Sequence, residues 1–303
     1  MSGGPQSRGL ALGLLGVTIF ALTLPMTRLA VGTPEAPHLP AAFLAFGRAA
    51  VAAVLAAAFL LAVRAPWPRR SDLLPLAVTS AGVVFGFPLF TSMAMRHVQA
   101  VHASVVIGTL PLATALVAAW LHRQRPSAGF WGCAVLGCAM VVAFSLSRAG
   151  APGLELHPAD LLLLAGVGCA AVGYAWGARL SQRMPAEHVI CWALLLALPL
   201  TLPASWWTRP AASVPAAAWW AFAYVAVFSM WLGFFAWYRG LALGGTVRVS
   251  QVQLLQPFLG MLFAVPLLGE TLDARSVGFA VAVMATVLVG RTMPVRTPRP
   301  ANP

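Results

Sequence analysis

The side chains best suited to bind a solute are polar groups set inside long apolar runs of the sequence. Four of them, Ser250, Gln251, Gln253 and Gln256, come directly before Pro257. Gln253 and Gln256 are three residues apart and share one face of a helix, and Pro257 frees the carbonyl group of Gln253. A buried amide without a partner is costly in lipid. This face therefore predicts either a solute site or a set of hydrogen bonds to neighbouring helices.

Weaker candidates lie in three other apolar runs. Small residues let helix backbones approach in lipid, so Ser104 and Pro111 favour helix packing, with cavity lining as the alternative. The aromatic residues Tyr174, Trp176 and Trp231 could form walls for an apolar or aromatic solute, or could be packed or lipid-facing.

Arg48 is the one cation inside an apolar run, about seven residues from its start. Seven residues correspond to about 10 Å of helix. A cation at that depth is usually paired or extends to the membrane surface. The sequence therefore predicts either a structural or gating role for Arg48 or a side chain that snorkels to the outer surface.

The acidic residues all fall in predicted connectors or at the edges of apolar runs. They are Glu35, Asp72, Glu155, Asp160, Glu187, Glu270 and Asp273. A proton antiporter of the small multidrug type uses a membrane-embedded carboxylate, so their placement favours facilitated diffusion or exchange. His97 and His102, at an outer junction, are predicted to be solvated, with a proton relay as the alternative. The sequence predicts no metal site and no cofactor, because the cysteines show no CxxC spacing.

The composition determines which elements hold these residues. Of the 303 residues, 60% are apolar and 9% charged, whereas soluble domains carry about 25% charged residues. Apolar runs of about 20 residues recur, and each can cross a bilayer as a helix. We therefore predict an all-α polytopic membrane protein with ten transmembrane helices. The predicted helices lie near 9–31, 41–63, 73–95, 101–121, 127–147, 159–180, 188–208, 216–238, 246–268 and 275–291.

The 19 basic residues are all arginine, and their distribution predicts the topology. With the N-terminus inside, 13 lie on the cytoplasmic side: Arg8, Arg64, Arg69, Arg70, Arg123, Arg125, Arg179, Arg183, Arg239, Arg248, Arg291, Arg296 and Arg299. Five lie on the other side: Arg28, Arg96, Arg148, Arg209 and Arg275. The positive-inside rule then places both termini in the cytoplasm.

Without a basic stripe and interleaved aromatics, the sequence indicates no nucleic-acid partner.

The two halves of the sequence resemble each other. Residues 16–30 align with residues 166–180 at an offset of 150, and a second set aligns at an offset of 146: Ser104, Pro111 and Gly132 with Ser250, Pro257 and Gly278. We predict a first repeat at 1–149 and a second at 150–303, which ends in a short cytoplasmic tail. Because each holds five helices, an odd number, the second repeat must be inverted.

The second half carries a recognisable motif. Ser250-x6-Pro257, Pro266-Leu267-Leu268-Gly269-Glu270 and Gly278 resemble the second EamA repeat of the drug/metabolite transporter superfamily. Phe43-x4-Arg48-x3-Val51 resembles the start of that family's second helix. The first half departs from the motif, with Arg123-Gln124 in place of Gly269-Glu270. The resemblance implies a transporter with a central cavity among the spans that begin near 9, 73, 101, 159, 216 and 246.

These observations together predict a multi-pass transporter of the bacterial inner membrane that exports small metabolites, above all amino acids, including aromatic or other neutral ones. Alternating access by facilitated diffusion or exchange is the first hypothesis, and a proton-coupled drug or metabolite antiporter is the alternative. An enzyme is disfavoured because no acid–base cluster or activated nucleophile lies at a membrane face. The predicted partners are a small-molecule solute and the lipid bilayer, and a monomer fits the sequence.

Overall fold

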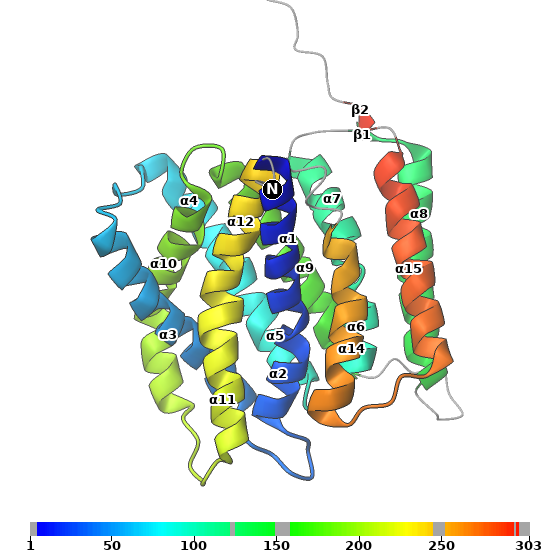
Figure 1. The fold of residues 1–303 in the computed structure, drawn as a ribbon, viewed down its shortest axis with the longest axis horizontal. Helices are drawn as coiled ribbons and strands as arrows, with labels where there is room; N and C mark the ends of the chain where they lie inside the picture. The colour runs from blue at the N-terminus through cyan, green and yellow to red at the C-terminus, as the bar shows by residue number, and fades with distance from the viewer. Residues whose placement is uncertain (1–4, 122–124, 149–157, 245–251, 294, 297–303) are drawn as a thin grey trace, which may run out of the picture.

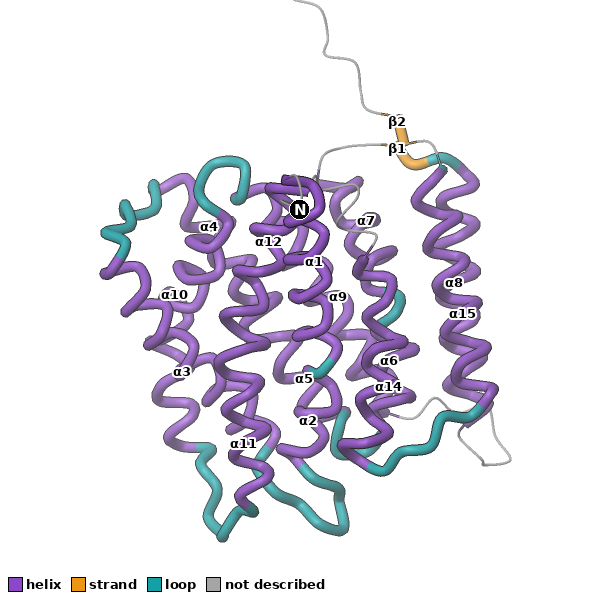
Figure 2. The backbone as a smooth tube through the Cα atoms, in the orientation of Figure 1, coloured by secondary structure: helices purple, strands orange, loops and turns teal. Residues whose placement is uncertain are grey.

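The computed structural model describes residues 5–121, 125–148, 158–244, 252–293 and 295–296, which form a bundle of helices (Figures 1 and 2). The first half contains α1 (Pro5–Ala21), α2 (Thr23–Val31), α3 (Ala41–Ala62), α4 (Arg70–Thr79), η1 (Ser80–Gly86), α5 (Phe87–Ala94), α6 (Ala100–Ile107), α7 (Leu110–Leu121), β1 (Arg125–Pro126) and α8 (Ala128–Arg148). The second half contains α9 (Pro158–Leu180), α10 (Ala186–Trp207), α11 (Ala216–Tyr224), η2 (Val225–Leu232), α12 (Gly233–Gly244), η3 (Gln253–Leu255), α14 (Gln256–Leu268), α15 (Ala274–Thr292) and β2 (Val295–Arg296). The two short strands pair antiparallel.

Seven helical stretches in the described residues are long and apolar enough to cross a membrane: 7–31, 41–62, 70–94, 100–121, 158–180, 186–207 and 216–240. Three further apolar helices, at 128–141, 253–268 and 274–290, are shorter. The structure thus confirms an all-helical, multi-pass membrane protein. The total of ten spans stays a prediction.

Two helices are interrupted just before a proline. The chain turns at Gly108 and Thr109 between α6 and α7, and a short 3-10 segment, η3, precedes α14. Pro111 and Pro257 are each the second residue of the helix that follows, where the missing proline N–H costs no hydrogen bond. The two helices begin at residues 110 and 256, so these breaks are repeated at the offset of 146 seen in the sequence.

Two π-helical segments are repeated in the same way. The π-helix η1 covers residues 80–86, and the π-helix η2 covers residues 225–232. An offset of 146 superimposes the first range on 226–232. π-Helical turns are uncommon and cluster at functional sites. Their recurrence therefore points to a functional role for the third helix of each half.

Helices at equivalent places in the two halves pack on each other. The helix α10 packs on α3, α14 on α6, and α15 on α8. The α8 and α15 pair lies at one edge of the bundle, on the right in Figure 1. The first helix of each half packs on the third helix of the other, α1 on α12 and α9 on η1 and α5.

Glycines allow the first and third helices to approach within backbone contact. A Cβ atom added at Gly82 of η1 would lie 2.3 Å from the carbonyl oxygen of Cys169 in α9. In the other half, a Cβ atom added at Gly240 of α12 would lie 2.7 Å from the backbone nitrogen of Gly13. Close approach of this kind is a main source of helix association in lipid.

The N-terminus of α6 is capped by a carboxylate that is distant in the sequence. The two side-chain oxygens of Glu270 accept hydrogen bonds from the backbone N–H groups of Ala100 and Val101, each at 2.8 Å. These N–H groups have no partner within their own helix, and a negative charge at a helix N-terminus is favourable. Glu270 therefore ties the loop after α14 to the start of α6.

We predict that Gly82→Ala lowers the melting temperature of the purified protein in detergent. The added methyl group collides with backbone that cannot rotate away, and overpacking costs about 1–3 kcal/mol. The matched control is Gly168→Ala in α9, because nothing lies within 4 Å of a Cβ atom at Gly168. A Gly82→Ala protein as stable as this control would contradict the close approach of η1 and α9.

We also predict that Glu270→Gln destabilises the fold by about 1–3 kcal/mol, because an amide supplies one acceptor where α6 offers two donors. Glu35→Gln is the control, since Glu35 is exposed at the same end of the molecule. Chemical unfolding monitored by tryptophan fluorescence compares the two variants. Equal unfolding midpoints would show that the cap contributes nothing.

Candidate functional site

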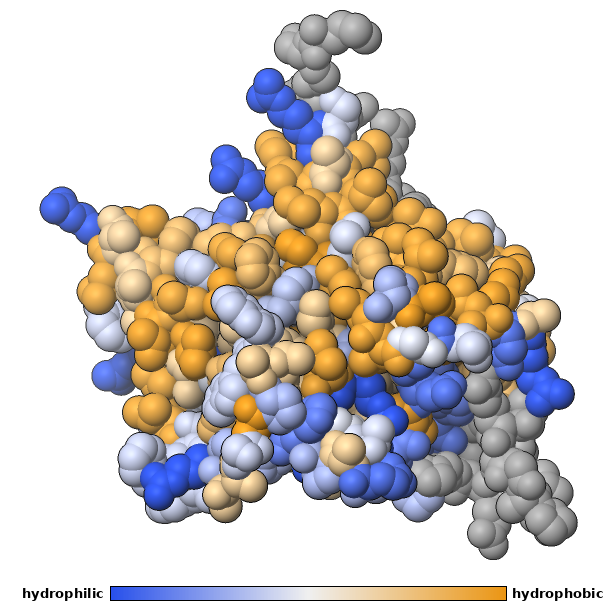
Figure 3. Space-filling model, turned by 60° about the horizontal axis from the view of Figure 1, so that its bottom comes forward, coloured by the Kyte–Doolittle hydropathy of each residue, from blue (hydrophilic) through white to orange (hydrophobic). Residues whose placement is uncertain are grey.

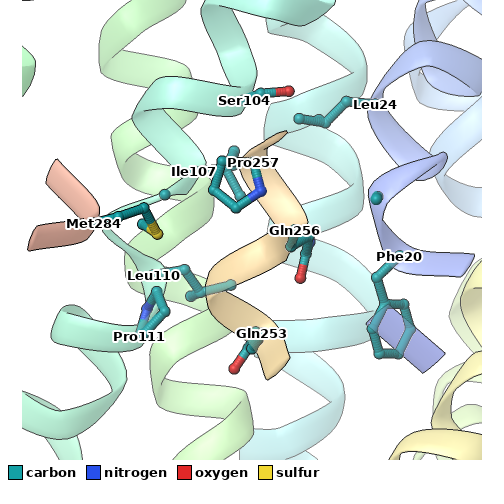
Figure 4. Close-up of a pocket in the computed structure, with 12 residues that line it drawn as sticks. Phe20, Leu24, Ser104, Ile107, Leu110, Pro111, Gln253, Gln256, Pro257 and Met284 are labelled. Atoms are coloured by element: carbon teal, nitrogen blue, oxygen red, sulfur yellow. The ribbon is translucent and has the colours of Figure 1, made fainter. Parts of the chain in front are cut away.

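Two adjoining cavities lie at the centre of the bundle. The first is lined by Phe20, Ala21, Leu24, Ser104, Ile107, Gly108, Leu110, Pro111, Gln253, Gln256, Pro257 and Met284 (Figure 4). The second is lined by Phe20, Thr23, Leu24, Arg48, Val83, Phe87, Ile107, Leu110, Tyr174, Ser229, Met230, Phe234 and Gln256. Their volumes are about 20 and 30 Å³, which is room for a few water molecules at most. The central site is therefore contracted in this conformation.

The structure places the two predicted glutamines together at this site. Gln253 and Gln256 both line the first cavity, and Gln256 also lines the second. Figure 4 shows both side chains on the segment that enters α14, with Phe20 opposite Gln256. Ser250 and Gln251, predicted alongside them, lie outside the described residues.

Ser104 and Pro111 line the first cavity, and Ser104 also packs against α14. The Ser104 hydroxyl donates a hydrogen bond to the carbonyl oxygen of Ala100 at 2.8 Å. Its oxygen would lie 2.7 Å from a Cβ atom on Gly260 of α14, so α6 and α14 are in close contact here. The structure is compatible with both predicted roles of Ser104, packing and cavity lining.

The three predicted aromatic residues lie in different surroundings. Tyr174 lines the second cavity, whereas neither Trp176 nor Trp231 lines either of these two cavities. The Trp176 ring lies 5.5 Å from the guanidinium carbon of Arg179. The Trp231 ring packs edge-on against Phe235, with centroids 5.2 Å apart. A helix that is apolar on every face does not reveal which aromatic residue points inward, so the sequence could not separate them.

Arg48 lines the second cavity with 1% of its surface exposed. The alternative that its side chain snorkels to the outer surface is therefore wrong, because α3 presents this residue to the interior of the bundle. Nearby, the hydroxyl oxygens of Thr23 and Ser229 lie 2.7 Å apart and form a hydrogen bond. This bond joins the break between α1 and α2 to the π-helix η2.

The prediction that His102 is solvated is also wrong. His102 is buried, and its Nε2 lies 2.6 Å from Oδ1 of Asp160, which is buried in the first turn of α9. The His102 ring stacks on Phe144 with centroids 4.9 Å apart. The two residues are 58 positions apart, and no local sequence signal joins them. Although Asp160 is at a helix edge as predicted, it is a buried titratable group.

A wider cavity of about 470 Å³ opens at the end of the bundle that holds the loop before α3. It is lined by Arg28, Leu29, Gly32, Thr33, His38, Gln99, Leu268, Gly269, Glu270 and Thr271, and we call it the vestibule. Hydrophilic residues gather at this end, while apolar surface covers the flank of the bundle (Figure 3). At its margin, backbone and Thr33 hydroxyl hydrogen bonds lower the pKa of the exposed Glu35.

Contacts at this end show the direction of the first helix in each half. The vestibule holds the end of α2 and Glu270, which caps the start of α6. His102 in that same start of α6 contacts Asp160 at the start of α9. The first helix of the first half therefore ends on the side where the first helix of the second half begins.

Comparison with known proteins identifies the family. The model of the EamA-like transporter family matches residues 7–146 and again residues 157–291. The chain is 43% identical over 283 residues to the uncharacterized transporter YdeK of Bacillus subtilis (strain 168), covering 92% of this chain and 95% of that protein. A crystal structure of another protein matches with a TM-score of 0.61 and 20% identity over 95% of this chain and 97% of the other, which supports the fold. The chain belongs to the EamA-like transporter family.

Proposed function

We propose that this transporter exports small neutral or zwitterionic metabolites, above all amino acids, across the bacterial inner membrane. The observation that carries the proposal is the central cavity, where the amides of Gln253 and Gln256 meet apolar and aromatic walls at a helix break. An amide offers both a donor and an acceptor, so it can serve a carboxylate or an ammonium group. The apolar walls suit a solute with an apolar side chain.

We propose that transport follows alternating access by two inverted repeats, 1–149 and 150–303. Support comes from the two successive matches to the family model, the recurring proline breaks and π-helices, and the opposed directions of α1 and α9. In this arrangement one bundle rocks against the other around the central site. The arginine distribution supports cytoplasmic termini, and with that topology the vestibule would face the outer side.

Facilitated diffusion or exchange fits the central site best. No carboxylate is among the residues that line either central cavity. A solute can therefore bind there without a protein carboxylate that must gain or lose a proton.

We predict that Gln253→Leu and Gln256→Leu weaken apparent solute affinity by about two- to tenfold while leaving membrane insertion normal. Each substitution keeps a similar volume and removes one neutral hydrogen-bonding group, worth about 0.5–1.5 kcal/mol. Uptake of an amino-acid panel into proteoliposomes measures the effect. Gln182→Leu is the control, because Gln182 is an exposed connector residue. Parent affinity in both cavity variants would assign the glutamines to helix packing.

The second candidate function, a proton-coupled antiporter, is favoured by one observation, the buried pair of His102 and Asp160. Proton antiporters use a carboxylate or histidine inside the bundle, and this pair supplies both. The contact joins the start of α6 to the start of α9.

We predict that collapsing the pH gradient leaves downhill solute flux in proteoliposomes largely unchanged, because the central cavities hold no carboxylate. Asp160→Asn and His102→Gln should then show the same insensitivity to the gradient as the parent. If parent transport stops without the gradient, and Asp160→Asn removes that dependence while still transporting downhill, the antiporter is correct.

A further inference from the structure

Arg48 presents unused hydrogen-bond donors to the second cavity. Its Nε and Nη1 atoms are buried and have no hydrogen-bond partner among the residues that the structure describes. An arginine side chain stays protonated in proteins, so this is a full positive charge at depth. A charge in a membrane bundle is costly unless it is paired, and its presence there marks a functional site.

The described residues that line the second cavity supply no counter-charge for Arg48. None of the side chains that line the second cavity is acidic. The hydroxyl groups of Thr23 and Ser229, which line the same cavity, bond to each other at 2.7 Å. The remaining walls are largely apolar or aromatic, with Tyr174 and Gln256 as the other polar residues. Because none of the described residues supplies a partner for Nε and Nη1, a ligand is the candidate to complete the guanidinium.

We propose that Arg48 binds the carboxylate of the transported solute, and that the substrates are monocarboxylates with an apolar body, such as neutral amino acids. This inference rests on the proposed function, because it concerns the same central site. Guanidinium and carboxylate form short, charge-assisted hydrogen bonds, often two in parallel. Gln256 lines the same cavity and can serve an ammonium or other polar group of the solute.

The apolar walls of the second cavity favour a carboxylate solute over an inorganic anion. Phe20, Leu24 and Phe234 line the second cavity with Arg48 and would leave the free oxygens of phosphate without donors. A carboxylate has a single charged end that faces Arg48, and the rest of the molecule can contact these walls. Chloride and phosphate are the alternative ligands, and an experiment must distinguish their binding from that of a carboxylate solute.

The experiment compares acids with their uncharged amides. Purified parent, Arg48→Met and Arg48→Lys proteins are titrated in detergent with L-phenylalanine, L-leucine, L-phenylalaninamide and L-leucinamide, and separately with chloride and phosphate. Thermal stabilisation gives apparent affinities, and counterflow in proteoliposomes measures transport. Arg209→Met is the control, because it removes a positive charge that is exposed at a helix end.

The parent should prefer each acid to its amide by about 10- to 100-fold, the worth of hydrogen bonds to a charged group. In Arg48→Met this preference should fall to within about twofold, and Arg209→Met should keep it. Without ligand, Arg48→Met should melt at or above the parent temperature, because it removes an unpaired buried cation. Arg48→Lys keeps the charge and should retain a weaker preference, which tests the proposal should the Met variant fail to insert.

Three outcomes would overturn the assignment, and they differ in what else they overturn. If the parent transports the panel and Arg48→Met keeps the full acid preference, Arg48 does not bind the carboxylate and the transport function stands. If neither acids nor amides bind or move, the proposed substrate class fails together with this assignment. Stabilisation by chloride or phosphate alone, lost in Arg48→Met, would make the site an inorganic anion site instead.

Discussion

The close contact between α9 and η1, and its counterpart between α1 and α12, is the constraint on which the rest of the structure depends. Helices in lipid gain little from burying apolar side chains, so close backbone approach must supply much of their association. Gly82 and Gly240 provide it, because a Cβ atom at either position would collide with the neighbouring backbone. These contacts hold the first and third helices of opposite halves together and bring irregular backbone to the centre.

Irregular backbone at membrane depth requires other partners for its polar groups. At the break between α1 and α2, the Tyr224 hydroxyl donates to the carbonyl oxygen of Ile19 at 3.0 Å, and Thr23 bonds Ser229. At the start of α6, both oxygens of Glu270 serve as the cap. Arg48 differs from these groups, because two of its buried nitrogen atoms are unpaired and it lines the cavity.

The vestibule and the central cavities differ in the charged residues that they contain. The vestibule holds Arg28, His38 and Glu270, and the His102 and Asp160 pair lies beside the Glu270 cap at the start of α6. The central cavities hold one cation and two amides among apolar walls. In the proposed direction of export, an anionic or zwitterionic solute would meet the single positive charge at the centre before the charges of both signs in the vestibule.

The sequence by itself determined the membrane class, the positions of most helices to within a few residues, and the break at Pro257. Hydropathy and proline geometry are local, so they can be read along the chain. Only the tertiary structure decided that Arg48 is buried, that Tyr174 faces the cavity while Trp231 does not, and that His102 meets Asp160. In lipid both the packed and the outward face of a helix are apolar, so the rotation of each helix about its axis leaves no periodic signal in the sequence and is set by packing against its neighbours.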